Sequence, residues 1–214
     1  MINFIPIFPL KVVVYPGEKL NLHIFEPRYK QLLGECIRES KPFGIPTVLD
    51  TKIEELGTLV EVAELVKEYD NGEMDVRTVG RSVFRILELV HDIPEKLYAG
   101  AIVNYPSNQL HRTESKTSEL IVQEIRRLYA LVNAEDKTPK DLDTLGSYGM
   151  AHLVGLSLQQ EYELLGLLDE TQRLEYIRRH LAAILPLVQN LEAMKSRIQQ
   201  NGHFKDLSLG DLKL

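Results

Sequence analysis

The chain has 214 residues and 44% of them are hydrophobic, so it can bury a core as one large domain or two small ones. Its 25 basic and 31 acidic residues give a net charge of −6, which disfavours nucleic acid as a partner. The single cysteine, Cys36, excludes an internal disulfide and no apolar run is long enough to span a bilayer, so we predict a cytoplasmic protein without a membrane segment.

The first predicted elements, from Phe8 onward, are an apolar strand, a turn, a second strand and a helix. Pro16-Gly17 is a turn signal, because proline fixes φ and glycine accepts a positive φ. Apolar and polar residues alternate over 20–25, which is the period of a half-buried strand. Pro27 suits the first position of a helix, where its missing N–H costs nothing, and the helix is expected to end near Ser40. Its apolar stripe consists of Tyr29, Leu32, Leu33, Cys36 and Ile37.

Four further segments alternate in polarity and are predicted to be strands: 57–66, 74–79, 82–90 and 98–105. Asp70-Asn71-Gly72 predicts a hairpin turn, because Asn and Gly tolerate left-handed backbone angles. Gly80-Arg81 lies between two of these strands, where a bulge or a tight bend would let the sheet curl. Short, mostly antiparallel strands with such glycines predict a small closed or nearly closed barrel over residues 1–106.

Residues 107–118 are polar and aperiodic, and we expect them to link the barrel to a helical part at 119–214. A 3.6-residue apolar spacing predicts a helix over 121–132, and a second helix is expected over 142–154. Two pairs of residues have the spacing of capping boxes and mark two more helix starts: Ser157 with Gln160, and Asp169 with Gln172.

The last predicted helix is the longest and extends from Glu170 to about Gln200. Its apolar residues step alternately by three and four positions, as in a heptad seam: Leu174, Ile177, Leu181, Ile184, Val188, Leu191 and Ile198. Pro186 is expected to kink or split this helix. The seam predicts packing on the preceding helices, with self-association through a protruding arm as the alternative. The tail at 203–214 carries five apolar residues and is expected to fold back on the body, the alternative being a partner-binding tail.

The stretch from Phe8 to Tyr29, FPLKVVVYPGEKLNLHIFEPRY, resembles the opening of the Lon N-terminal domain family, including Phe25-Glu26-Pro27-Arg28. The likeness continues at Gly57-Thr58, Gly72 and Gly80-Arg81, in the family's order. It implies an α+β fold in which an N-terminal PUA-like small β-barrel with one packed helix is followed by a C-terminal α-helical bundle with a long last helix. The family is the substrate-recruiting end of an ATP-dependent protease.

Motifs for catalysis are missing from the sequence. A phosphate-binding loop of the Walker A type needs a Gly-Lys pair, and this chain contains none. The residues around Ser147 and Ser157 approach the G-x-S-x-G pattern, but each lacks one glycine. The six histidines show no H-x-x-x-H spacing and the single cysteine no C-x-x-C pair, so we expect no metal and no cofactor. The Ser-Lys peptidase domain that the resemblance implies for the whole protease is also missing, and we expect no enzymatic activity.

The resemblance implies a noncatalytic module that recognises unfolded or apolar protein segments, as an adaptor or a holdase in protein quality control. The alternatives are an RNA-binding PUA-like protein, which the acidic charge balance disfavours, and a ligand-binding or enzymatic site in the barrel mouth. The candidate substrate-binding residues are Phe25, Arg28 and Tyr29. Each also has a structural explanation, because the two aromatic residues could pack in the core and Arg28 could pair with Glu26.

Overall fold

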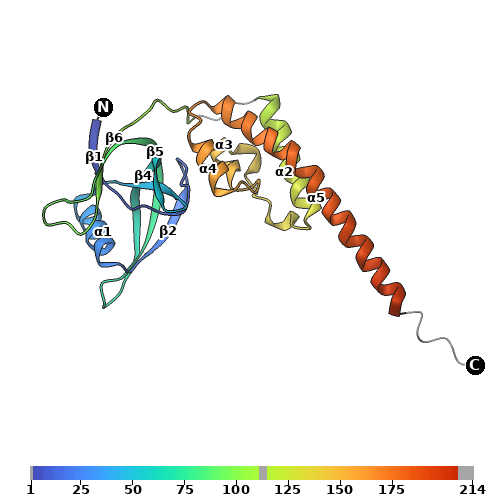
Figure 1. Cartoon of the computed structure of the whole chain (residues 1–214), viewed down its shortest axis with the longest axis horizontal. Helices are drawn as coiled ribbons and strands as arrows, with labels where there is room; N and C mark the ends of the chain where they lie inside the picture. The colour runs from blue at the N-terminus through green and yellow to red at the C-terminus, as the bar shows by residue number, and fades with distance from the viewer. Residues whose placement is uncertain (1, 111–114, 207–214) are drawn as a thin grey trace, which may run out of the picture. The chain divides into compact units, whose positions relative to one another are not determined.

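A computed structural model describes residues 2–110 and 115–206, with their side chains as far as Lys195. Within these residues an antiparallel sheet of six strands is followed by helices that include a long C-terminal helix (Figure 1), so the predicted α+β fold is confirmed. The strands are β1 (Ile2–Pro6), β2 (Lys19–Ile24), β3 (Phe43–Leu49), β4 (Lys52–Glu68), β5 (Met74–Val90) and β6 (Gly100–Asn104). The helices are α1 (Pro27–Glu39), α2 (Lys116–Leu131), α3 (Ser147–Ala151), α4 (Leu158–Leu165) and α5 (Glu170–Asp206), with 3-10 turns η1 (Glu135–Lys137) and η2 (Leu142–Thr144).

The chain divides into two compact units, which we describe separately. Residues 1–113 and 145–173 form the sheet unit, and residues 114–144 and 174–214 form the helical unit. The division is based on contacts between segments, so residues 145–173 belong to the sheet unit although they come late in the sequence. The domain boundaries expected from the sequence, 1–106 for a barrel, 107–118 for a linker and 119–214 for a helical part, stay a prediction.

The sheet brings the first strand next to the last one. Its order is β1-β6-β5-β4-β3, with antiparallel neighbours throughout, and β2 pairs with the first part of β5. After β1 the chain leaves β6 and forms parallel bridges to β3, where Ile7 pairs with Gly44 and Leu10 with Thr47. These bridges join the two edges of the sheet, so the sheet closes on itself at this level.

The bend predicted at Gly80-Arg81 is present as a bulge inside one long strand. Val60 of β4 pairs with Gly80 and its neighbour Leu59 pairs with Ser82, which leaves Arg81 as the extra residue. A Cβ atom on Gly80 would overlap the carbonyl oxygen of Tyr15, so this position accepts glycine alone without a shift of the backbone. The segments expected as two strands, 74–79 and 82–90, are therefore the two parts of β5.

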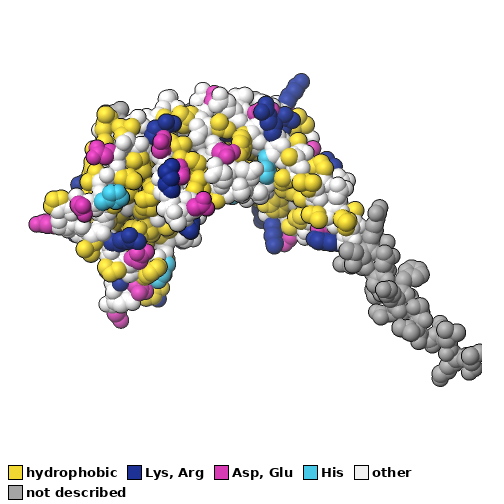
Figure 2. All heavy atoms as spheres, in the orientation of Figure 1, with side chains coloured by type: hydrophobic (Ala, Val, Ile, Leu, Met, Phe, Trp, Pro, Cys, Tyr) yellow, Lys and Arg dark blue, Asp and Glu magenta, His cyan; other side chains and the backbone are white. Residues whose placement is uncertain are grey.

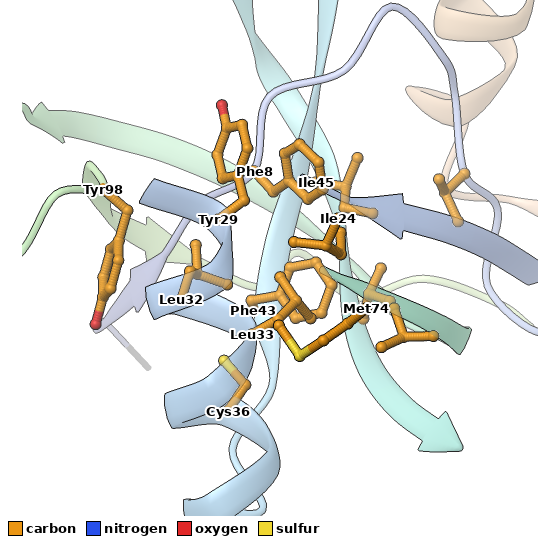
Figure 3. Packing of buried hydrophobic residues seen from close by; sticks show 13 residues of the cluster. Phe8, Ile24, Tyr29, Leu32, Leu33, Cys36, Phe43, Ile45, Met74 and Tyr98 are labelled. Atoms are coloured by element: carbon orange, nitrogen blue, oxygen red, sulfur yellow. The ribbon is translucent and has the colours of Figure 1, made fainter. Parts of the chain in front are cut away.

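Helix α1 packs on the sheet with the apolar stripe that the sequence predicts. Pro27 occupies the start of the helix, and Ser40 ends it with a left-handed backbone, φ 51°. The stripe packs on residues from β2, β3 and β5, as Figure 3 shows. Its buried members are Tyr29, Leu32, Leu33 and Cys36. Burial raises the pKa of the Cys36 thiol to about 12, so this cysteine behaves as a core residue.

Helices α3 and α4 pack inside the sheet unit against the segment between β1 and β2, and α4 also contacts β3 and β4. The Tyr15 hydroxyl donates to the carbonyl oxygen of Glu161, 3.0 Å away, and the Tyr15 ring stacks on Tyr148 with 5.0 Å between centroids. The capping box of Ser157 and Gln160 is confirmed at the start of α4. A continuous helix over 142–154 was a wrong prediction, because η2 and α3 are separate elements.

The helical unit contains α2, η1, η2 and most of α5. Helix α2 begins at Lys116, ahead of the predicted start, because Ser115 and Ser118 form a capping box. The first half of the α5 seam is buried, as expected for packing on other helices, whereas Leu191 is 58% exposed. Helix α5 continues through Pro186 and past the predicted end to Asp206, so the expected split is wrong. The predicted fold-back of the tail concerns residues 203–214, of which residues 203–206 belong to α5 and residues 207–214 lie outside the described part of the chain.

Candidate functional site

The three candidate residues lie where β2 meets α1, and the structure gives them different environments. Phe25 is 59% exposed, whereas Tyr29 is buried and packs on Phe8 with 3.9 Å between ring centroids. The Arg28 guanidinium bonds to the Glu26 carboxylate at 2.8 Å and covers the Tyr29 ring, 4.5 Å from its centroid. Burial raises the pKa of Tyr29, and the charge of Arg28 opposes this shift. Phe25 is therefore an accessible apolar group, while Tyr29 is part of the core.

Acidic groups of the hairpin between β4 and β5 surround His23, whose ring lies next to Phe25. The His23 ring lies 6.2 Å from the Phe25 ring, and its Nδ1 is 2.7 Å from the Asp75 carboxylate. The Tyr69 hydroxyl donates to the same carboxylate at 2.8 Å, and Glu73 lies 3.4 Å from the other nitrogen of His23. The hydrogen bonds from His23 and Tyr69 lower the pKa of Asp75, so it carries a negative charge at neutral pH. An exposed ring next to His23 and its two carboxylates suits an apolar or basic partner side chain.

A groove of about 630 Å³ follows β1, and sequence reasoning did not identify it. Two apolar side chains of β1 are accessible, since Ile2 is 67% and Phe4 is 52% exposed. On the groove wall, Leu59 and Tyr105 are partly buried against the second core cluster of the sheet, around Phe84. The complete lining consists of Ile2, Asn3, Phe4, Ile5, Pro6, Lys41, Pro42, Leu59, Ser82 and Tyr105. These residues come from distant parts of the sequence, so no local pattern marks the groove.

The polar cluster around Arg173 is buried, since Ser147, Glu170 and Arg173 are 1%, 2% and 0% exposed. The Glu170 carboxylate accepts from the backbone N–H of Ser147 at 2.9 Å and from its hydroxyl at 2.5 Å. The Arg173 guanidinium donates to Glu170 at 2.8 Å and to the Ser147 hydroxyl at 2.7 Å. Ser147 therefore makes structural hydrogen bonds inside the sheet unit, which explains one of the two near matches to a nucleophile motif. The other serine, Ser157, caps α4.

His152, which follows the last residue of α3, bridges two carboxylates within the sheet unit. Its Nδ1 lies 2.7 Å from a carboxylate oxygen of Glu161, and its Nε2 lies 3.1 Å from one of Glu18. The hydrogen bond with Glu18, with that of Glu161 in support, raises the pKa of His152 to about 9 against the effect of burial. Both ring nitrogens then carry protons, and the imidazolium ties α3 and α4 to the turn before β2.

Neither a metal centre among the described residues nor a large basic surface on the face shown in Figure 2 stands out. The described residues contain no group of three or more His, Cys, Asp or Glu side chains that could hold a metal ion. Basic and acidic side chains are interspersed over the sheet unit, at the left of Figure 2, with hydrophobic side chains between them. Among the helices that the structure describes, none combines the length and apolar composition that crossing a membrane needs.

Comparisons with known proteins agree with this fold. Residues 5–183 match the family model described as the ATP-dependent protease La (LON) substrate-binding domain. A Lon N-terminal domain protein from Xanthomonas campestris is similar in structure, with a TM-score of 0.62, 25% identity and coverage of 81% of this chain and 95% of its own. The N-terminal domain of the Mycobacterium avium complex Lon protease shares the fold, with a TM-score of 0.56, 12% identity and coverage of 84% of this chain and 98% of its own. Because the family model matches more than half of the sequence, the chain belongs to the family of Lon substrate-binding domains.

Proposed function

We propose that this chain is a noncatalytic module that binds unfolded or apolar segments of other proteins. Membership of a substrate-binding family supports a protein substrate. The observation that carries the proposal is the groove along β1, which offers exposed Ile2 and Phe4 beside partly buried apolar residues. Exposed apolar surface of this kind is characteristic of protein-binding sites. Its role would be that of an adaptor or a holdase in the cytoplasm.

Phe25 extends the proposal to a second contact point. Its accessible ring and acidic surroundings favour apolar or basic segments, and Arg28 would contribute to the same contact. Tyr29 would act indirectly, because the Arg28 guanidinium packs on its ring. The PUA-like relationship that the sequence implies would supply a scaffold for this surface, and nothing in the proposal requires ATP, a metal or a nucleophile.

The test of the proposal compares how strongly the chain binds the native and the unfolded form of one protein. Native and reduced, carboxymethylated α-lactalbumin share a sequence, and we expect the chain to bind only the unfolded form in fluorescence anisotropy. A 20-nucleotide RNA of mixed sequence serves as the competitor that represents the RNA-binding alternative. Equal binding of native and unfolded α-lactalbumin, or preferential binding of the RNA, would contradict the proposal. Turnover of ATP or cleavage of casein by the pure chain would contradict its noncatalytic part.

A second part of the proposal concerns self-association through α5. Three apolar residues near the end of its described side chains, Leu187, Leu191 and Met194, are 62%, 58% and 60% exposed. Their spacing of four and three places them on one face of the helix, as in a coiled-coil seam. Light scattering after size exclusion is expected to give a mass above that of one chain for the wild type. The variant Leu191→Glu would reduce it to one chain, and a monomeric wild type would reject this part.

A further inference from the structure

Strand β1 has one edge that bonds to β6 and one edge without a strand partner. The Ile7 N–H donates to Ala99 at 3.0 Å, on the β6 side, whereas the Phe8 N–H donates to Gly44 at 2.8 Å, on the β3 side. Backbone groups alternate between the two edges of a strand. The main-chain groups of Phe4 therefore point in the same direction as those of Phe8, away from β6.

At Phe4 no neighbouring strand receives these groups. The bridges to β3 involve Ile7 and Leu10, and residues 2–6 pair with β6 alone. Within the described part of the chain, Phe4 pairs with Ile102 of β6 and takes part in no bridge to a second strand. Pro6 has the same orientation but has no N–H to donate, and it directly precedes Ile7, where the bridge to Gly44 of β3 begins. The free edge is thus centred on Phe4 and is short.

The groove along β1 contains both exposed and partly buried apolar side chains. The side chains of Ile2 and Phe4 are exposed, and those of Leu59 and Tyr105 form a partly buried part of the wall. An extended peptide presents its own N–H and C=O groups to an edge and points alternate side chains to one face. The edge supplies the hydrogen bonds that such a peptide needs, and the wall supplies an apolar surface for every second side chain.

We propose that an extended apolar segment of a client protein binds by adding a strand to the free edge of β1 at Phe4. This inference rests on the proposed function and specifies how the client is held. Because most of the hydrogen bonds involve main-chain atoms, the site would select for extended, β-branched or aromatic segments without requiring a fixed sequence. A folded client would be excluded, since its backbone groups are already paired.

The most direct test measures the Phe4 amide in the wild-type chain. The probe is the peptide acetyl-Lys-Val-Thr-Ile-Thr-Val-Lys-amide, and its control is the same peptide with N-methyl groups on the three central residues. Strand addition predicts that the first peptide slows hydrogen exchange of the Phe4 amide in ¹⁵N-resolved NMR spectra and that the N-methylated control does not bind. Peptide binding without a change in Phe4 exchange, or equal binding of the control, would overturn the inference.

Two variants at the same position separate the backbone from the side chain. Phe4→Ala removes the ring and keeps the N–H, whereas Phe4→Pro removes both. Because this N–H points away from β6, both variants are expected to keep the wild-type fold, in contrast to Ile5→Pro, which removes a bond to β6. Loss of the edge hydrogen bond and the steric block by the proline ring predict that Phe4→Pro binds the peptide about tenfold more weakly than Phe4→Ala. Equal affinities of the two variants would reject strand addition.

The outcomes also separate this inference from the proposed function. If unfolded α-lactalbumin binds but the Phe4 amide and the Phe4→Pro variant show no effect, strand addition is wrong and protein binding stands. If neither the peptide nor unfolded α-lactalbumin binds, both are wrong. A Phe4 amide that is protected without peptide in the Leu191→Glu variant, in a particle of twice the chain mass, would mean that a second copy occupies the edge and would also overturn the inference.

Discussion

Arg173 and Glu170, one turn apart on α5, form an ion pair from which water is excluded. Their side chains are 0% and 3% exposed, and 2.8 Å separates the guanidinium nitrogen from the carboxylate oxygen. The guanidinium has further acceptors in the segment after β6, in the loop after α4 and in α3: Asn108, Gln109, Leu167, Ser147 and Tyr148. A single side chain thus connects three segments of the sheet unit that are distant in sequence.

Neutralising Glu170 should therefore cost the sheet unit much of its stability. Glu170→Gln keeps the shape of the side chain but leaves Arg173 buried without its counterion, and breaking a buried pair in this way costs about 3–5 kcal/mol. Urea unfolding followed by circular dichroism measures the loss. The matched control is Glu175→Gln on the same helix, whose ion pairs with Arg178 and Arg179 are exposed, so little change is expected. Similar losses in both variants would refute the importance of burial.

The bridge at His152 predicts a specific dependence of stability on pH. Because its pKa is raised from 6.5 to about 9 in the folded chain, the imidazolium stabilises the fold fully below pH 6.5. This contribution is lost as the pH rises from 6.5 through 9. The difference in unfolding free energy between wild type and His152→Gln, measured at several pH values, should therefore shrink over this interval. A difference that stays constant from pH 6 to pH 9.5 would show that the ring is neutral in the fold.

Two glycines make a matched pair for the effect of a single methyl group. In Gly80→Ala the new methyl overlaps the Tyr15 carbonyl oxygen, and the overpacking should destabilise the chain by about 1–3 kcal/mol. In Gly34→Ala the methyl meets no atom within 4 Å and lies in the middle of α1, so a gain of about 1 kcal/mol is expected. Thermal unfolding of the two variants beside the wild type checks both signs. A stable Gly80→Ala variant would mean that the bulge in β5 can shift.

Phe25 and Tyr29 should respond to substitution in opposite ways. Tyr29→Ala removes a buried ring and should cost about 3–5 kcal/mol of stability. Phe25→Ser changes an exposed ring, so stability should stay within about 0.5 kcal/mol while binding of unfolded α-lactalbumin weakens. Arg28→Gln, which keeps a polar side chain over Tyr29, provides a second binding variant. Unchanged binding by folded Phe25→Ser would remove Phe25 from the proposed surface.

The elements that sequence reasoning identified are those with short-range signals. The alternation over 20–25 and the stripe that begins at Tyr29 correspond to β2 and α1, because both patterns depend on neighbours a few residues away. The apolar strand predicted ahead of Pro16-Gly17 is wrong, because residues 8–15 lie between β1 and β2 and belong to neither. Strand β3 was not predicted. Its sequence, FGIPTVL, is buried at its first five positions and contains Pro46, so it lacks alternation and includes a residue that disfavours strands.

The parts of the candidate site that escaped prediction depend on contacts over long distances in the chain. The groove combines β1 with Leu59 and Tyr105, and only the sheet order brings them together. The Arg173 cluster joins residues up to 65 positions apart. In contrast, the local ion pair of Arg28 with Glu26 could be anticipated, since the two residues are separated by a single position.

The pairing of β1 with β6 also sets the order of events during synthesis. Residues 2–6 acquire their partner only when Gly100–Asn104 have been made, and the entire chain from β2 to β5 is translated in between. Translation proceeds at roughly 5–20 residues per second. The apolar strand β1 is therefore without its partner strand for on the order of several seconds to tens of seconds. The bridges of Ile7 and Leu10 to β3 can form earlier, because β3 ends at Leu49. The newly made chain therefore depends on this early junction, or on a chaperone, to keep its first strand from aggregating.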